Sequence, residues 1–392
     1  MTAPLWLLTL ITFSGTFAMH MFVPALPEAA RALGASIGEM QMTMSIYIFG
    51  LAAGQLAYGP LADRYGRRPV LVSGLLLYTI AGLAASIVPD VHSLIVARLM
   101  QALGGCAGLV IGRAIVRDSA LPQEAAKRLA TMNLMVALGP GAAPLIGGVL
   151  STAFGWRSLF YALSALGAMN VLFALWLLPE SRAPTAKISG SALARNYGKL
   201  LTSPAFLGFS IGGGCATTSM YAFIGASPFI FAHQLNRPDY EIGLYPAILV
   251  AGIWLGSMAA TRLIPRLPIE KLAVGGNGVS VAASLIFLGA VLSNHLTVML
   301  AIGPMFIFGI GAGIASPAAL TQAISVDPQV IGSASGLYGF SQMGVGAICT
   351  ALVGLGTDPA LSAAVILVVA GAIGQAAFWI ALRYRAPAAP TV

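Results

Sequence analysis

Two ionisable side chains lie inside long apolar runs of this sequence, where a charge is costly to bury. They are His20, in the run 5–26, and Arg98, in the run 93–117, with Gln101 three residues after Arg98. Ionisable groups inside such runs usually serve a function, and histidine gains or loses a proton near neutral pH. We therefore predict that these three residues form a central polar site.

No carboxylate accompanies them at the same depth. The chain has only twelve Asp and Glu residues, and each maps to a loop or to the end of an apolar run. Two cationic or potentially cationic groups without an acid favour a neutral or anionic ligand over a cationic one. Two alternatives stay open. In the first, His20 is an inert core imidazole, and the protein is either uncoupled from protons or coupled by an acid at a helix end such as Glu39 or Asp118. In the second, Arg98 extends to the membrane surface.

The remaining histidines and the three cysteines do not group into another recognisable site. They are scattered, and the sequence contains neither H-E-x-x-H nor the phosphate-binding pattern G-x-x-x-x-G-K-[ST]. We therefore predict no enzyme activity, no metal site and no cofactor. A membrane-embedded enzyme is kept as a remote alternative.

A basic loop at 59–69 reads Gly-Pro-Leu-Ala-Asp-Arg-Tyr-Gly-Arg-Arg-Pro. Its glycines allow a tight turn, and Asp63 can pair with a neighbouring cation. Two more basic residues, Arg113 and Arg117, follow at the end of the run 93–117. We predict a charge cluster at this face, with a purely topogenic loop as the alternative.

Glycine and proline are dense in the run 128–150. The segment 139–148 reads Gly-Pro-Gly-Ala-Ala-Pro-Leu-Ile-Gly-Gly. Prolines bend a helix, and glycines let a neighbouring helix approach closely. The segment predicts a kinked helix in close contact with another, built on Gly139, Pro140, Pro144, Gly147 and Gly148.

These motifs resemble those of the major facilitator superfamily. The loop 59–69 is similar to its signature G-x-L-a-D-r-x-G-r-k, and Leu94-x-x-x-Arg98-x-x-Gln101-x-x-Gly104 is similar to its intramembrane arginine motif. The segment 139–148 resembles a motif found mainly in its antiporters. Three further segments, 23–27, 226–231 and 332–342, narrow the resemblance. With them, the chain resembles the bicyclomycin- and chloramphenicol-resistance drug:proton antiporters.

The resemblance implies efflux of a drug-like solute in exchange for protons, by alternating access and with the proton gradient as energy source. Proton coupling then falls to His20, Arg98 and Gln101. The sequence departs from the family at one point, because His20 stands four residues before Pro24, where the family usually has Asp. The resemblance also implies a cytoplasmic gate that holds the outward-open state, formed by Gly59, Asp63, Arg64, Gly66, Arg67, Arg68, Arg113 and Arg117.

The composition is that of a polytopic membrane protein. Hydrophobic residues make up 58% of the 392 residues and charged residues only 8%, too little polar surface for a soluble body. The net charge of +8 is better explained by basic cytoplasmic loops than by nucleic-acid binding. We expect a lipid bilayer, protons and a small drug-like molecule as partners, and a monomer.

Twelve apolar runs are arranged as six, a gap and six. The pattern predicts an all-α membrane protein with 12 transmembrane helices in two six-helix bundles, residues 1–178 and 204–392, joined by a cytoplasmic linker at 179–203. Gly50, Gly54 and Arg64 recur 202 residues later as Gly252, Gly256 and Arg266. Such a parallel repeat predicts a substrate cavity between the halves.

Basic residues fall mainly on one side of this arrangement. Sixteen Lys and Arg residues lie on one side and three on the other, which predicts cytoplasmic termini. The resemblance implies that the membrane is a bacterial inner membrane. We expect a transporter that exports antibiotics or other drugs, with solute uptake by symport or facilitated diffusion as the alternative. Candidate cavity residues, each with simple packing as its alternative role, are Tyr47, Asn133, Tyr221, Trp254, Tyr338 and Gln342.

Overall fold

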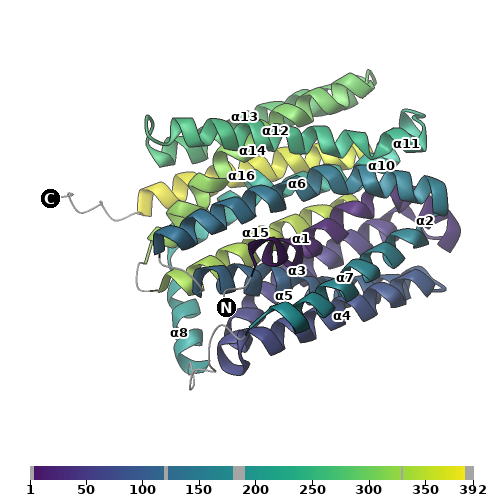
Figure 1. Cartoon of the computed structure of the whole chain (residues 1–392). Coiled ribbons are helices and arrows are strands. Elements are labelled where there is room, and N and C mark those ends of the chain that lie inside the picture. Colours follow the sequence, from purple (N-terminus) through teal and green to yellow (C-terminus); the bar gives the residue numbers. More distant parts are fainter. Residues whose placement is uncertain (1–3, 119–121, 180–189, 328–329, 385–392) are drawn as a thin grey trace.

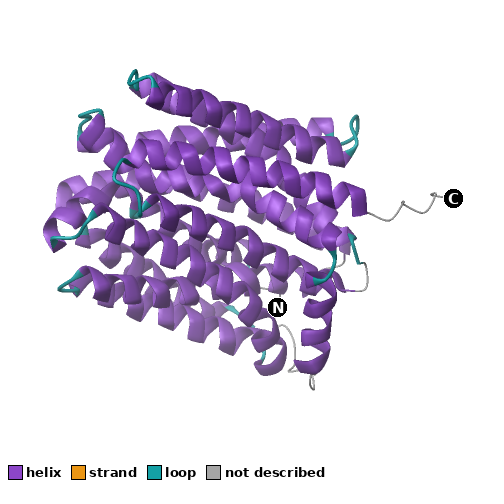
Figure 2. Ribbon diagram, turned by 180° about the vertical axis from the view of Figure 1, so that it is seen from behind, coloured by secondary structure: helices purple, strands orange, loops and turns teal. Residues whose placement is uncertain are grey.

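The computed structural model describes residues 4–118, 122–179, 190–327 and 330–384. Every regular element in these ranges is a helix, and the long helices lie side by side (Figure 2). This is the arrangement expected of long apolar segments, because a backbone in hydrocarbon must satisfy its hydrogen bonds within each helix.

The described residues of the first half form seven helices and one short 3₁₀ turn. Helix α5 packs against α1, α3 and α4, and α1 also packs against α6. The elements are α1 (Leu5–Met21), η1 (Val23–Ala25), α2 (Leu26–Leu33), α3 (Ile37–Tyr65), α4 (Arg67–Ile87), α5 (Val91–Asp118), α6 (Pro122–Phe154) and α7 (Arg157–Leu177).

The second half has a similar order of helices, and its first long helix is interrupted in the middle. Helix α14 packs against α12, α13 and α9, as α5 does against its neighbours. The elements are α9 (Pro204–Thr217), η2 (Thr218–Met220), α10 (Tyr221–Phe229), η3 (Ile230–Gln234), α11 (Asp239–Ile242), α12 (Leu244–Leu263), α13 (Ile269–Leu292), α14 (Val298–Ser325), α15 (Ile331–Val353) and α16 (Pro359–Tyr384).

A short helix, α8 (Gly190–Leu201), lies between the halves and crosses the long helices at one end of the molecule (Figure 1). Leu200 packs into an apolar cluster of the second half, and Lys199 forms an ion pair with Asp327. The basic loop between α3 and α4 lies at this same end, which we call the charged end. The end where α3 and α5 begin is called the opposite end.

Ten helical segments of the described residues are long and apolar enough to cross a membrane. Helices α3 and α6 have 29 and 33 residues but are not among the ten. Helix α3 carries Gln41, Ser45 and Gln55 along its length and the charged loop at its end. Its lower hydropathy follows from these polar side chains, which face protein rather than lipid.

The glycines of the internal repeat have the same role in both halves. A Cβ added at Gly50 would lie 2.7 Å from Ala102, and one at Gly54 would lie 2.6 Å from Cys106, so that α3 packs tightly on α5. Their counterparts Gly252 and Gly256 approach the backbone of α14 just as closely, at Phe306 and Ile310. Small residues therefore bring the equivalent helix pair together in each half.

Candidate functional site

Arg98 is completely buried inside the first half. Its Nη1 donates hydrogen bonds to the carbonyl oxygen of Ala18 (3.3 Å) and to Oε1 of Gln101 (2.8 Å). Its Nε and Nη2 have no hydrogen-bond partner. The guanidinium is therefore held by two neutral acceptors and no carboxylate.

Aromatic rings take the place of a counter-ion around Arg98. The guanidinium carbon lies 3.9 Å from the ring centre of Tyr47, 5.3 Å from that of Phe22 and 5.8 Å from that of Phe160. The hydroxyl of Tyr47 donates to the carbonyl oxygen of Gly15 at 2.7 Å, which fixes its ring. The electron-rich faces of such rings attract a cation, and more strongly when water is absent.

His20 is also buried, with 1% of its surface exposed. Its Nδ1 lies 2.9 Å from the carbonyl oxygen of Thr16. Because a carbonyl only accepts, Nδ1 must carry the proton of this bond, and Nε2 is the unprotonated nitrogen of the neutral ring. Nε2 is buried without a partner, and the ring centre lies 5.9 Å from that of Tyr221, in the second half.

His20 and Arg98, which the sequence placed in one central polar site, do not face each other. Arg98 bonds to α1 at Ala18, and two residues along a helix correspond to a rotation of about 200°, so His20 points to the other side of α1. No hydrogen bond or ion pair joins the two side chains. Arg98 belongs to the interior of the first half, whereas His20 faces the second half.

The candidate cavity residues have different surroundings. Tyr47 packs on Arg98, and Tyr221 on His20. Tyr338 is buried against Gly213, and Gln342 donates to the hydroxyl of Thr217 at 2.8 Å; both contacts join α15 to α9. Trp254 is partly buried, and Asn133 lies outside the residues whose side chains are described.

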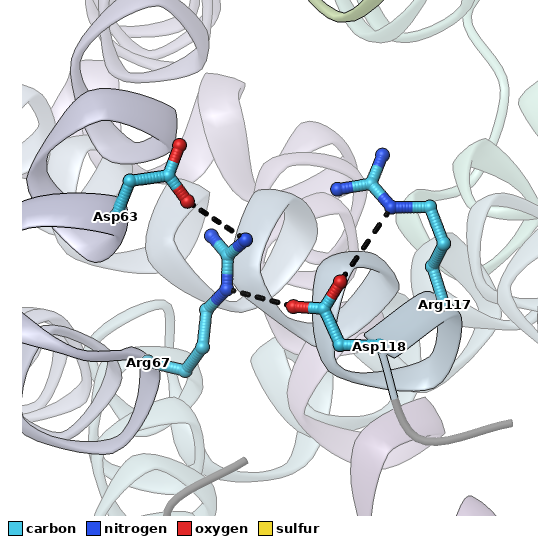
Figure 3. Close-up of polar contacts among 4 residues, drawn as sticks. All are labelled: Asp63, Arg67, Arg117 and Asp118. Carbon is cyan, nitrogen blue, oxygen red and sulfur yellow. Dashed lines mark hydrogen bonds and ion pairs between the residues drawn. The ribbon is translucent and has the colours of Figure 1, made fainter. Parts of the chain in front are cut away.

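Four charged residues meet at the charged end (Figure 3). Arg67 is 3% exposed and pairs with Asp63 at 2.9 Å and with Asp118 at 3.2 Å, and Arg117 approaches Asp118 at 3.8 Å. The geometry depends on Gly66, whose φ of 96° separates α3 from α4. Helix α4 can therefore begin at Arg67 and bring its guanidinium between two carboxylates.

The other expected gate residues lie around this cluster. Arg64 packs on the ring of Tyr65, 5.0 Å from its centre, and Arg68 donates to the carbonyl oxygen of Leu175. At Gly59 an added Cβ would meet nothing within 4 Å. Arg113 is exposed and forms no ion pair with this cluster.

The glycine- and proline-rich segment of α6 contacts both halves. Added Cβ atoms at Gly139 and Gly147 would overlap Phe13 and Met21 of α1. On another face of α6, Gly243 of the second half lies against the carbonyl of Pro144 and close to Gly148. Pro140 and Pro144 both lie within the helix.

Helices α3 and α15 form a seam between the halves that sequence reasoning missed. Ser45 donates to the carbonyl oxygen of Ala347 (3.1 Å), and Gln55 donates to that of Gly339 (3.3 Å). Gln41 is completely buried here, and neither atom of its amide has a partner. Isolated glutamines in an otherwise apolar run were the available signal.

The seam is closed at the opposite end and open at the charged end. Gly38 lies so close to the carbonyl oxygen of Gly354 that an added Cβ would overlap it. Four residues beyond Gln55, on the same face of α3, Gly59 has no such neighbour. On α15, Gly336 lies close to the backbone of Gln55, but Gly332, four residues earlier on the same face, has no neighbour within 4 Å of an added Cβ. The two helices therefore separate toward the charged end.

Acidic groups stay at the ends of the helices throughout the described part of the chain. The acids nearest the centre of a long helix are Glu39, in the first turn of α3, Asp63, in its last turn, and Glu124, in the first turn of α6, each two residues from the helix end. Among the described residues, no three His, Cys, Asp or Glu side chains gather as a metal site would require. The polar site around Arg98 is therefore cationic and aromatic.

The sequence profile described as Major Facilitator Superfamily matches residues 8–350. The chain belongs to the major facilitator superfamily. Proteins of this superfamily are membrane transporters, and this protein is accordingly an integral inner-membrane transporter and not an enzyme.

Several bacterial proteins are similar to this superfamily member over most of its length. It is 28% identical to the uncharacterized MFS-type transporter YdgK of Bacillus subtilis, over 95% of this chain and 94% of that protein. A bicyclomycin resistance protein homolog of Haemophilus influenzae is 26% identical, with 86% and 85% covered. A chloramphenicol resistance protein of Pseudomonas aeruginosa is 28% identical, with 86% and 80% covered.

Solved structures share the fold at lower identity. An inward-facing, unoccupied bacterial homolog of the human lysosomal transporter Spinster superposes with a TM-score of 0.75, at 17% identity and 98% coverage of both chains. A D-xylose-proton symporter superposes with a TM-score of 0.76, at 13% identity and 97% coverage of both chains. These likenesses establish the fold of the superfamily for this chain.

Proposed function

We propose that this protein exports drug-like solutes in exchange for protons by alternating access. The observation that carries the proposal is the position of His20 at the contact between the halves: its Nε2 has no hydrogen-bond partner, and its ring centre lies 5.9 Å from that of Tyr221 in the second half. The names of the relatives support the substrate class, because proteins similar over most of this chain are called bicyclomycin and chloramphenicol resistance proteins.

The membrane arrangement that we propose has twelve spans. It adds α3 and α6 to the ten apolar segments and divides the chain into halves at 1–178 and 204–392, with 179–203 as linker. The excess of Arg and Lys at the charged end supports a cytoplasmic location for that end and for both termini. In this arrangement the protein is open toward the cytoplasm.

Proton transfer is assigned to His20. Its neutral ring offers Nε2 as the acceptor, and a proton bound there places a positive charge beside Tyr221 and the seam. A charge at this contact favours opening of the opposite end, where water can reach the ring. Substrate and proton then alter each other's affinity through the same conformational equilibrium.

The proposed substrates are neutral or anionic rather than cationic. The buried ionisable side chains His20 and Arg98 contact neutral acceptors, and no carboxylate compensates either of them. A cationic drug would meet repulsion there, whereas a neutral or anionic one would not. The proton gradient supplies the energy, and the transport cycle that we propose uses no cofactor and a single copy of the chain.

Transport of chloramphenicol into inside-out membrane vesicles tests the proposal. An imposed gradient, acidic inside the vesicles, should drive accumulation by the wild type. The His20→Ala variant should lose gradient-driven accumulation, and His20→Asp should keep it with a shifted pH profile. His92→Ala removes an exposed histidine and is the matched control.

Full gradient-driven export by His20→Ala would refute the role of His20. Gradient-driven movement of solute in the other direction would favour uptake, which the same fold supports in a D-xylose-proton symporter. Because both directions use one fold, only the direction of the coupled flux separates them.

A further inference from the structure

Arg113 is an exposed cation within the membrane-spanning helix α5. Within the described part of the chain it makes no hydrogen bond, ion pair or ring contact, although it was expected in the charge cluster. The carboxylates nearby are already engaged, since Asp63 and Asp118 both bind Arg67. Arg113 therefore keeps all five of its N–H donors available.

The level of Arg113 along the bundle follows from the contacts between α3 and α5. These helices run in the same direction, and Gly50 meets Ala102 as Gly54 meets Cys106, each pair separated by 52 positions. The same offset places Arg113 level with Leu61, two residues beyond Gly59. Arg113 is also five residues, or about 7.5 Å along the axis, from the end of α5.

This is the level at which the seam between the halves is open. Gln55 still bonds to Gly339, but Gly59 and Gly332 have no neighbour within 4 Å of an added Cβ. Arg113 therefore lies beside the opening between the halves, just inside the charged end.

The surroundings of α5 decide what Arg113 is exposed to. Helix α1 covers one face of α5, where Gly108 meets Ile11, and α4 covers another, where Gly104 meets Tyr78. Helix α3 covers a third face, where Gly54 meets Cys106, and Arg113, seven residues after Cys106, lies on that face at the level of Leu61. A charged side chain within a membrane helix faces protein or a water-filled cavity rather than hydrocarbon. Because Arg113 is exposed and has no partner among the described residues, this rule indicates that its side chain faces water in the opening between the halves.

We propose that Arg113 binds the anionic group of amphiphilic organic substrates that enter between the halves at the charged end. A carboxylate, sulfonate or phosphate monoester matches the forked guanidinium, which can donate two parallel hydrogen bonds to it. Leu61, which is 41% exposed at the same level, offers apolar contact to the rest of such a molecule. This assignment rests on the proposed transport function and specifies its substrate class.

Equilibrium binding to the purified protein in lipid nanodiscs tests the assignment with two matched probes. Chloramphenicol is neutral, and its succinate half-ester adds one carboxylate to the same molecule. The wild type should bind the half-ester more tightly than chloramphenicol. Arg113→Gln should weaken binding of the half-ester about tenfold or more and change that of chloramphenicol less than about threefold.

Two further variants separate binding from charge alone. Arg113→Lys keeps the charge without the fork and should retain part of the preference for the half-ester. Arg266→Gln removes an exposed arginine from the α12–α13 loop at the same end and should change neither affinity. The thermal midpoint of each variant, measured in the same nanodiscs, identifies any loss of folding.

Equal weakening of both probes by Arg113→Gln, or no preference of the wild type for the half-ester, would overturn the anion site. Export measured in parallel distinguishes failure of the anion site from failure of the transport proposal. A wild type that exports chloramphenicol without preferring the half-ester contradicts only the anion site. A wild type that exports neither probe but binds the half-ester through Arg113 contradicts only the transport proposal.

Discussion

Arg98 keeps its charge in the interior of the protein without a carboxylate. Two neutral acceptors and three aromatic rings surround it, and its Nε and Nη2 remain without partners. Burial of an incompletely paired charge costs free energy that such contacts offset only in part. A residue retained at this cost is better explained by function than by stability.

The Arg98→Met variant should therefore separate function from stability. We expect chloramphenicol export to fall about tenfold or more, and the thermal midpoint to rise or to stay within about 3 °C of the wild type. A thiol-reactive dye can report unfolding, because Cys106, Cys215 and Cys349 are all buried. A large drop of the midpoint would instead show that Arg98 mainly holds the first half together.

At the scale of elements, the contact between α3 and α15 determines which end of the molecule is closed. At the opposite end the two backbones touch at Gly38 and Gly354, and Gln41 is buried beside them without a partner. An unsatisfied buried amide costs about 1–3 kcal/mol, and opening of that end hydrates it. Close packing therefore stabilises the closed seam, while the unsatisfied amide of Gln41 destabilises it and makes opening easier.

Gly38→Ala should hold the opposite end apart, because the added Cβ overlaps the carbonyl oxygen of Gly354. Spin labels at Ser93→Cys and Ser293→Cys, both exposed at that end, should show a larger share of long distances. Gly289→Ala adds a Cβ that meets nothing within 4 Å and serves as control. An unchanged distance distribution in Gly38→Ala would mean that the helices slide without opening.

At the scale of the whole molecule, the charge cluster is complete while the charged end is open. Arg67 pairs with Asp63 and Asp118 within the first half alone. We propose that the cluster is a preformed surface on which the second half docks when the charged end closes, and that it keeps α3, α4 and α5 in fixed relative positions.

Asp63→Asn leaves Arg67, which is 3% exposed, with one carboxylate instead of two. We expect the incomplete cluster to hold α3, α4 and α5 less firmly, and therefore to weaken closure of the charged end and to slow export. Spin labels at Tyr65→Cys and Arg266→Cys should show more of the open state. If Asp63→Asn leaves both export and these distances unchanged, the loop serves only to set topology.

The twelve apolar runs and the superfamily motifs were sufficient to predict an all-helical membrane transporter. The physical reason is that a long apolar segment must be a helix in a bilayer, whatever its neighbours. The charge cluster was also predictable in part, because Gly66 and the short loop leave Asp63 and Arg67 within reach of each other. These features depend on local chemistry and on short separations along the chain.

The rotation of each helix about its axis was decided only by the tertiary structure. In a bilayer every face of a helix is apolar, so hydrophobic periodicity does not show which face meets protein. Contacts between small residues of neighbouring helices set the rotation instead. They turn Arg98 into the first half and His20 toward Tyr221. They also place Gln342 in a hydrogen bond with Thr217 and leave Arg113 beside the opening.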